Sequence, residues 1–166
     1  MIEAAATGIT EWDVVIRIVL ITALSGFIGV EREYAHKPAG LRTNVMVGLG
    51  STIFTLASIR AIDLFPGTLT DPTRIAAQIV TGIGFLGVGT ILVDKEKESV
   101  VGLTTAATLW VVAGLGITVG MGLYLESLVA TAMVFFTFFV LSRIVDRVRA
   151  KNRVDNPHGE TKYAEK

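Results

Sequence analysis

The sequence predicts an all-α protein that crosses a membrane with about five helices. Of its 166 residues, 51% are hydrophobic and only 18% are charged, and the mean hydropathy is +0.60. Its apolar residues gather into runs of about 20, the length that a helix needs to cross roughly 30 Å of hydrocarbon. A soluble domain of this size usually carries more charge. Both observations indicate that most of the chain lies in lipid.

Five runs reach this length. They are rich in Ala, Leu and Gly and lack period-2 alternation, which disfavours strands. Gly120 and Gly122 are expected to form the turn between the last two runs, because one helix of about 40 residues would overrun the bilayer. We expect the spans at residues 12–30, 43–65, 72–93, 100–122 and 123–142.

The Lys and Arg residues predict the orientation of the bundle. With the C-terminus in the cytoplasm, twelve of the fifteen fall on the cytoplasmic side, and only Arg17, Arg60 and Arg74 lie outside. Cytoplasmic loops carry such an excess, so the N-terminus is expected outside. Residues 29–50, which hold a charge cluster between two apolar runs, then contain a cytoplasmic loop.

The two ends of the chain are expected to differ from its membrane domain, residues 1–150. The N-terminal stretch has no positive segment and no small-residue cleavage site, so it is not expected to be a cleaved signal peptide. Residues 151–166 are polar and aperiodic, which predicts a disordered basic tail near anionic headgroups. The chain has no cysteine, which excludes disulfides and thiolate sites.

Charges predicted on the outer side come in pairs at helical spacing, three or four residues apart. We expect these pairs to neutralise themselves at the interface, which argues against a cage of free carboxylates around a divalent cation. The pairs are Asp13 with Arg17, Arg60 with Asp63, and Asp71 with Arg74.

The third predicted span carries a polar face. Asp71 and Pro72 predict its N-cap and first residue. Polar residues inside a membrane are candidates for a functional site, although Gln can also simply bond an adjacent helix. The face holds Arg74, Gln78, Thr81 and Gly82.

Glycines and threonines of the third and fourth spans leave two interpretations open. The stretch "TGIGFLGVG" fits close helix packing, and it also fits a bent helix that presents backbone groups to an ion. Thr104, Thr105 and Thr108 are expected to bond to carbonyls of their own helix, and Trp110 to fill the bundle.

No catalytic constellation is visible, so the chain is not expected to be an enzyme. His36 and His158 lack metal-ligand spacing, and no P-loop or dinucleotide fingerprint is present. No metal site, cofactor or nucleic-acid partner is expected. The middle of every predicted span also lacks ionisable residues, which are the usual lining of proton and cation paths.

Three ordered motifs carry a family resemblance: "GFIGVEREYAHKPAGLRTNVMVGLGS", "DPTRIAAQIVTGIGFLGVGTIL" and "GLTTAATLWVVAGLGITVGMGLY". They resemble the MgtC/SapB family of bacterial inner-membrane proteins over most of the chain. The resemblance implies a multi-pass inner-membrane location and links with growth at low magnesium. For the virulence-associated branch it implies survival in macrophages. It also implies restraint of the F-type ATP synthase, and direct magnesium transport has been proposed for the family.

The resemblance singles out a cytoplasmic loop and the starts of two spans. Many relatives have a His where this chain has Asn44, so no role of an ionisable group transfers there. Several relatives carry a soluble domain after the last span, where this sequence has a short tail. The matching positions are Glu31, Arg32, Pro38, Gly40, Leu41, Arg42 and Thr43; Asp71, Pro72, Arg74, Gln78, Gly82, Gly84 and Gly87; and Leu103, Thr104, Thr105, Ala106 and Trp110.

Three functions are compatible with these residues. The first is a regulator that contacts another membrane complex, such as the ATP synthase, through a rigid loop braced by Glu31 and Arg42. The loop could also be a simple solvated connector. The second is a small transporter or channel for Mg²⁺ or another ion, probed at Gln78 on the third span. The third is a structural role in assembly, and a homo-oligomer fits all three.

Overall fold

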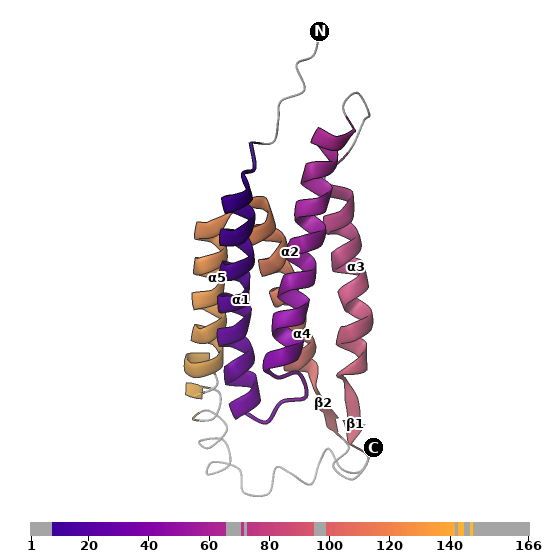
Figure 1. The fold of residues 1–166 in the computed structure, drawn as a ribbon. Helices are drawn as coiled ribbons and strands as arrows, with labels where there is room; N and C mark the ends of the chain where they lie inside the picture. Colours follow the sequence, from indigo (N-terminus) through magenta and orange to yellow (C-terminus); the bar gives the residue numbers. More distant parts are fainter. Residues whose placement is uncertain are drawn as a thin grey trace, which may run out of the picture. The chain divides into compact units, whose positions relative to one another are not determined.

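Five α-helices and one β-hairpin follow each other in the described residues. The computed structural model describes residues 8–65, 71, 73–94, 99–141, 143, 144 and 147. The helices are α1 (Glu11–Tyr34), α2 (Leu41–Leu64), α3 (Thr73–Gly89), α4 (Leu103–Met121) and α5 (Tyr124–Phe136) (Figure 1). Residues 1–131 form one compact unit, in which α2 packs against both α1 and α4, and α3 packs mainly against α4. Residues 132–166 belong to a second unit.

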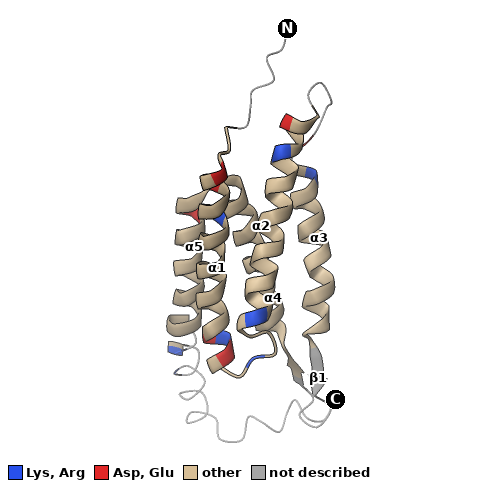
Figure 2. Ribbon diagram, in the orientation of Figure 1, with Lys and Arg blue, Asp and Glu red and all other residues tan. Residues whose placement is uncertain are grey.

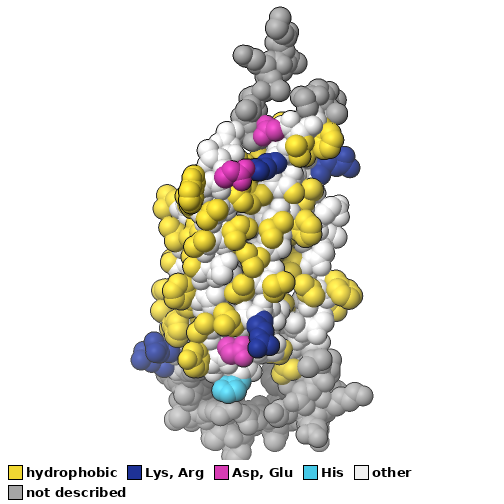
Figure 3. Space-filling model, in the orientation of Figure 1, with side chains coloured by type: hydrophobic (Ala, Val, Ile, Leu, Met, Phe, Trp, Pro, Cys, Tyr) yellow, Lys and Arg dark blue, Asp and Glu magenta, His cyan; other side chains and the backbone are white. Residues whose placement is uncertain are grey.

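Lengths and charges of the helices fit a membrane. Among the described residues, four helical stretches are long and apolar enough to cross: α1, α2, α4, and Tyr124–Leu141, where α5 continues into the π-helical turn η1 (Thr137–Leu141). The charged residues of α1, α2 and α3 lie toward the helix ends (Figure 2), with an apolar band between them (Figure 3). The prediction of an all-α, multi-pass membrane protein is confirmed. The predicted tail, residues 151–166, lies outside the described residues.

The third helix is shorter than predicted. It ends at Gly89 and has 17 residues, which is about 26 Å at 1.5 Å per residue. Two antiparallel strands follow, β1 (Leu92–Asp94) and β2 (Ser99–Val101), with Leu92 paired to Val101. The predicted spans 72–93 and 100–122 therefore overran into a hairpin. Their ends are rich in β-branched residues on both sides of a charged sequence segment, a pattern that favours a hairpin.

A glycine with positive φ stands at each end of α4. Gly102, at φ 94°, precedes the helix, and a Cβ there would collide with the carbonyl oxygen of Thr90. Gly122, at φ 85°, ends the helix, while Leu123 N donates to Thr118 O at 2.9 Å. This is the geometry of a helix terminated by a left-handed residue. The predicted turn at Gly122 is confirmed, whereas Gly120 lies inside α4.

The α2–α4 contact depends on small residues. A Cβ on Gly116 would lie 2.5 Å from Ser51 Cβ and 2.6 Å from Gly48 O, and Thr52 Oγ1 donates to Gly116 O at 2.9 Å. A Cβ on Gly120 would lie 2.7 Å from Thr55 Cβ. Helices in lipid associate largely through such close packing. Tight packing is therefore what Gly116 and Gly120 of α4 provide, whereas Gly82 and Gly84 of α3 face open space.

Arg17 of α1 lies at the same end of the unit as the α4–α5 turn at Gly122, and it is 8% exposed. Its Nη1 donates to Gly120 O at 2.7 Å and its Nε donates to Tyr124 Oη at 3.3 Å. A cation placed at the last carbonyls of α4 is stabilised by the helix dipole. Arg17 thus ties α1 to the α4–α5 turn, so the sequence-based pairing of Arg17 with Asp13 is wrong.

The carboxylates of Asp13 and Asp71 cap helix starts instead of pairing with the arginines. Asp13 accepts from Thr10 N at 2.8 Å and Thr10 Oγ1 at 2.7 Å in a capping box. Asp71 accepts from Thr73 N at 2.9 Å and Thr73 Oγ1 at 2.7 Å, and these bonds lower the pKa of Asp71, with a smaller contribution from the charge of Arg74. Asp71 is therefore a cap, as predicted, and not the ion-pair partner of Arg74.

Arg60 was also predicted to form a pair on the outer side. Its Nη2 lies 3.5 Å from Glu11 Oε1 and 3.4 Å from Ile9 O, so it connects α2 with the start of α1. Glu11 is 90% exposed, and such surface pairs contribute little to stability.

Candidate functional site

The connecting loop, residues 35–40, joins α1 to α2, and several of its backbone groups form hydrogen bonds. His36 N donates to Glu33 O at 3.0 Å and Lys37 N donates to Arg32 O at 3.0 Å. His36 takes the left-handed conformation, with φ 53°, which reverses the chain after α1. Gly40 caps α2 without a side chain, and Glu33 Oε2 accepts from Leu41 N at 2.9 Å instead. The last turn of α1 thereby supplies the cap of α2.

Asn44 holds the end of the loop from inside the bundle. Its Nδ2 donates to Ala39 O at 3.0 Å and to Gly40 O at 2.8 Å, and the side chain is fully buried. These two acceptors identify which end of the amide is nitrogen. Its Oδ1 finds no hydrogen-bond donor among the described residues. An unpaired buried polar atom costs stability, so the two bonds from Nδ2 to the loop carbonyls are what offsets the burial of the Asn44 side chain.

The loop is also packed into the core. Ala39, 3% exposed, belongs to a buried apolar cluster with Ile83 of α3 and Leu109 and Ala113 of α4. On the other side, a Cβ on Gly29 would lie 2.7 Å from Leu41 Cα, so the backbones of α1 and α2 touch beside the loop. The loop therefore has contacts to α1, α3 and α4.

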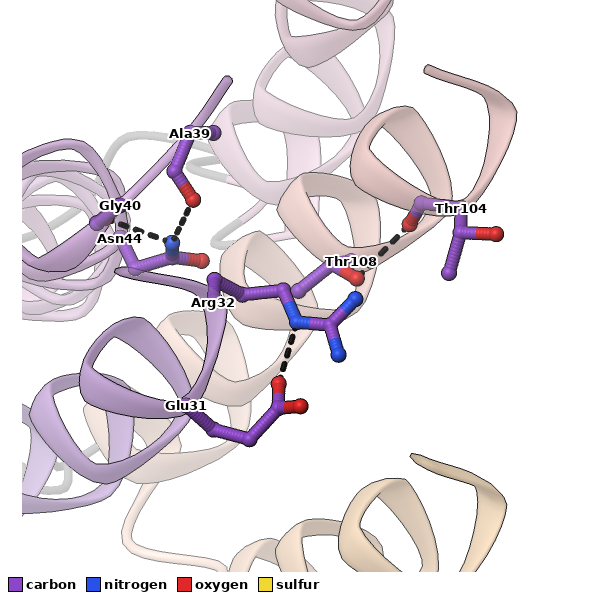
Figure 4. A network of polar contacts seen from close by, with 7 residues as sticks. All are labelled: Glu31, Arg32, Ala39, Gly40, Asn44, Thr104 and Thr108. Atoms are coloured by element: carbon purple, nitrogen blue, oxygen red, sulfur yellow. Dashed lines mark hydrogen bonds and ion pairs between the residues drawn. The ribbon is translucent and has the colours of Figure 1, made fainter. Parts of the chain in front are cut away.

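Arg32 is buried beneath the loop. It is 5% exposed, it points from α1 toward Thr104 and Thr108 of α4, and its Nε donates to Glu31 (Figure 4). The predicted brace between Glu31 and Arg42 is therefore wrong: Arg42 is exposed and makes no ion pair within the described part of the chain. The physical reason is the burial of Arg32, since a buried guanidinium requires a carboxylate and Glu31 is adjacent.

The outward side of this region combines an aromatic ring, cations and apolar atoms. We call it the docking face. Tyr34 is 82% exposed and Leu41 is 39% exposed, and the cationic and proline side chains are also exposed. Thr43 is exposed beside it. The docking face consists of Tyr34, His36, Lys37, Pro38, Leu41 and Arg42.

The second set of predicted residues is not brought together. One group is exposed on α3 and just before it. Gly87 faces α4 instead, since a Cβ added to it would lie 3.6 Å from Ala106 Cβ. Thr105 is in the core and only 2% exposed. Thr104 is exposed, and Thr108 Oγ1 donates to Thr104 O at 2.7 Å, as expected for a helical threonine. The exposed group is Asp71, Arg74, Gln78, Thr81, Gly82 and Gly84.

A groove of about 580 Å³ runs between α2 and α3. Its lining is almost wholly apolar, and the side-chain oxygens in it come from Thr43, Ser51 and Gln78. In the described part of the chain, no three His, Asp or Glu side chains are grouped to hold a metal ion. Trp110, expected inside the bundle, is 56% exposed, so that expectation is wrong.

Sequence reasoning missed the buried roles of Arg17 and Asn44 and the capping bond of the exposed Glu33. For Arg17, a signal was present in α1, because the buried positions Arg17, Ile21, Ile28 and Arg32 follow helical spacing. Both arginines therefore lie on the apolar face of α1, at its two ends. Asn44 and Glu33 left no such signal, since their partners are backbone atoms of a folded loop.

Comparison with known proteins decides the family. The MgtC family model matches residues 18–147, well over half of the chain. The chain belongs to the MgtC family. The three motifs described above were therefore interpreted correctly, and both the connecting loop and α3 lie within the match.

Relatives within the MgtC family come from several bacteria. The chain is 40% identical over 146 residues to "Putative magnesium transporter YhiD" of Escherichia coli K12, covering 84% of this chain and 66% of the relative. It is 35% identical to protein SapB of Bacillus subtilis, covering 82% and 60%. It is 40% identical to protein MgtC of Salmonella typhimurium 14028s, covering 81% and 54%. The chain thus spans between about half and two thirds of these relatives. No solved structure matches it.

Proposed function

We propose that this MgtC family member is a bacterial inner-membrane protein that regulates another membrane complex by direct contact, in adaptation to low magnesium or to host stress. The observation that carries the proposal is the connecting loop, whose backbone is fixed from beneath by Asn44 and Glu33. A loop that only connects two helices needs neither the buried side chain of Asn44 bonded to it nor a residue such as Ala39 packed into the core. A surface that is rigid before it binds loses little entropy on binding, which favours affinity.

The chemistry of the docking face indicates the kind of partner. Tyr and Arg side chains are enriched at the centres of protein interfaces, and Tyr34 and Arg42 are both exposed here. Lys37 and Arg42 carry positive charge, which complements an acidic surface and accelerates encounter with it. The excess of Lys and Arg on this side favours the cytoplasm, where the F-type ATP synthase exposes its own loops. That complex is the partner we propose.

The expected result of neutralising the docking face is a weaker partner effect at unchanged protein level. In inverted membrane vesicles that contain the F-type ATP synthase, we expect the wild-type chain to lower ATP-driven proton pumping. With Lys37→Gln and Arg42→Gln together, about tenfold more chain should be needed for half of that effect, because interface cations often contribute more than 1 kcal/mol. Fluorescence quenching of a pH-sensitive dye measures the pumping.

Arg74→Gln is the matched control, since Arg74 is also an exposed cation but lies at the start of α3. It should act like the wild-type chain. Equal potency of the double variant and the wild type would remove the docking face from the mechanism. A chain that leaves pumping unchanged at every ratio would remove the ATP synthase as the partner.

Ion transport is the second candidate, and the groove that contains Gln78 is the observation in its favour. The name of the YhiD relative also refers to magnesium transport. However, Mg²⁺ requires near-octahedral oxygen coordination, usually with one or two carboxylates, and the groove residues provide no carboxylate. The regulator therefore agrees better with the described residues.

We expect Mg²⁺ uptake into liposomes that contain the chain to equal uptake into empty liposomes, as measured with an entrapped fluorescent indicator. The matched variant is Gln78→Leu, which removes one of the few side-chain oxygens in the groove. Uptake well above the empty control that falls in Gln78→Leu would replace the regulator with a transporter whose route follows α3.

A further inference from the structure

α3 is the least covered helix of the first unit. Its buried residues are Ile83 and Gly87, which pack toward α4, while the face that bears Gln78 is exposed. Gln78 lies five residues after the start of the helix, about 7 to 8 Å along its axis. A membrane-spanning α3 therefore carries this side chain below the level of the headgroups.

The amide of Gln78 makes no hydrogen bond within the described part of the chain. Lipid tails offer it no donor or acceptor, and an unpaired amide in hydrocarbon costs several kcal/mol. By contrast, Thr81 on the same face satisfies its hydroxyl by donating to Ala77 O at 3.1 Å. A lipid acyl chain in the groove would leave Gln78 unpaired, so a polar group of a protein is the occupant that fits.

The shape of this face also fits another helix. Gly82 and Gly50 line the groove, and a Cβ added at either would meet nothing within 4 Å. Glycines in open positions allow a second backbone to come close. Phe85 lies seven residues after Gln78, which places it on the same side of α3, and it is 84% exposed. The face therefore presents both a hollow and a projecting ring.

We propose that this face of α2 and α3 is an interface with a second copy of the same chain, in which the two Gln78 amides bond to each other. All copies insert in the same direction, so a twofold axis along the membrane normal brings equal depths together. An amide has both donors and an acceptor, so two copies can satisfy each other reciprocally. Phe85, on the same side of α3, then lies in the same interface and is covered by the other copy, as a self-complementary interface allows. This proposal is independent of the docking face.

Disulfide trapping in membranes of cells that express the full chain tests this interface, because the chain has no cysteine of its own. Gly82→Cys places a thiol in the groove one turn from Gln78. Val80→Cys is the matched control, since Val80 is 42% exposed on α3 at similar depth but does not line the groove. After mild oxidation, non-reducing gels should show several-fold more covalent dimer for Gly82→Cys than for Val80→Cys.

A second substitution tests the amide pair itself. In the Gly82→Cys background, Gln78→Leu should lower the dimer yield at low protein-to-lipid ratio by about 3- to 30-fold, the effect of an interhelical hydrogen bond in lipid. Gln78→Asn retains an amide and should retain most of the dimer. Equal yields for Gly82→Cys and Val80→Cys would overturn the proposal, as would a Gly82→Cys adduct formed only with a different protein.

Discussion

Replacing Gly116 with valine is expected to lower the free energy of unfolding by about 3 kcal/mol. The added methyl groups would meet Gly48 O and Thr52 N, which are backbone atoms of α2 and cannot rotate away. The helices would have to separate, with loss of the bond from Thr52 Oγ1 to Gly116 O. Reversible unfolding in bicelles, followed by steric trapping or by detergent titration, measures the change.

Gly114→Val provides the control for this experiment. It makes the same chemical change two residues earlier in α4, where an added Cβ meets nothing within 4 Å. Its free energy of unfolding should stay within about 0.5 kcal/mol of the wild type. Similar losses for the two variants would mean that helix propensity, and not the α2–α4 contact, determines the result.

Arg32→Met is expected to cost about 3 kcal/mol of unfolding free energy, because it leaves Glu31, only 18% exposed, without its cation. Glu31→Gln should cost a similar amount, since it removes the carboxylate that accepts from the buried guanidinium of Arg32. The double variant should recover most of the loss, because the two groups are coupled. The same unfolding measurement, applied to all four proteins of this cycle, gives the coupling energy.

Arg42→Gln is the matched control, because Arg42 is exposed and unpaired among the described residues. It should change the free energy of unfolding by less than about 0.5 kcal/mol. If the losses of Arg32→Met and Glu31→Gln simply added in the double variant, the pair would not be a unit. If Arg42→Gln were as damaging as Arg32→Met, Arg42 would have a partner in the folded state.

The number of helices could be predicted from sequence because bilayer thickness limits their length. The hairpin after α3 could not, since Val100 and Val101 look the same in an apolar helix and in a strand. The difference lies in Gly102, whose positive φ separates β2 from α4. The sequence contains many glycines, and nothing in it indicates that Gly102 takes the left-handed conformation.

The charge pairs show why spacing alone misled the prediction of the site. Asp13 is three residues from Thr10 and four from Arg17, and its carboxylate bonds to Thr10 in a helix cap. Arg17 lies on the buried face of α1, so its partners come from 103 and 107 residues further along the chain. In the same way, Asn44 bonds loop carbonyls whose positions exist only after α1 and α2 have packed. Contacts of this kind depend on tertiary structure that a sequence pattern does not contain.

The short α3 has a consequence for the bilayer. At 17 residues it spans about 26 Å, whereas α1 and α2, with 24 residues each, span about 36 Å. With α3 in the bilayer, its short length would be met by thinning of the adjacent lipid, by snorkelling of flanking residues or by association, and such mismatch costs fractions of a kcal/mol per Å. Two copies that meet along α3 remove that thinned boundary from the lipid. Under the proposed α3 interface, thicker membranes should consequently strengthen the association of the two copies.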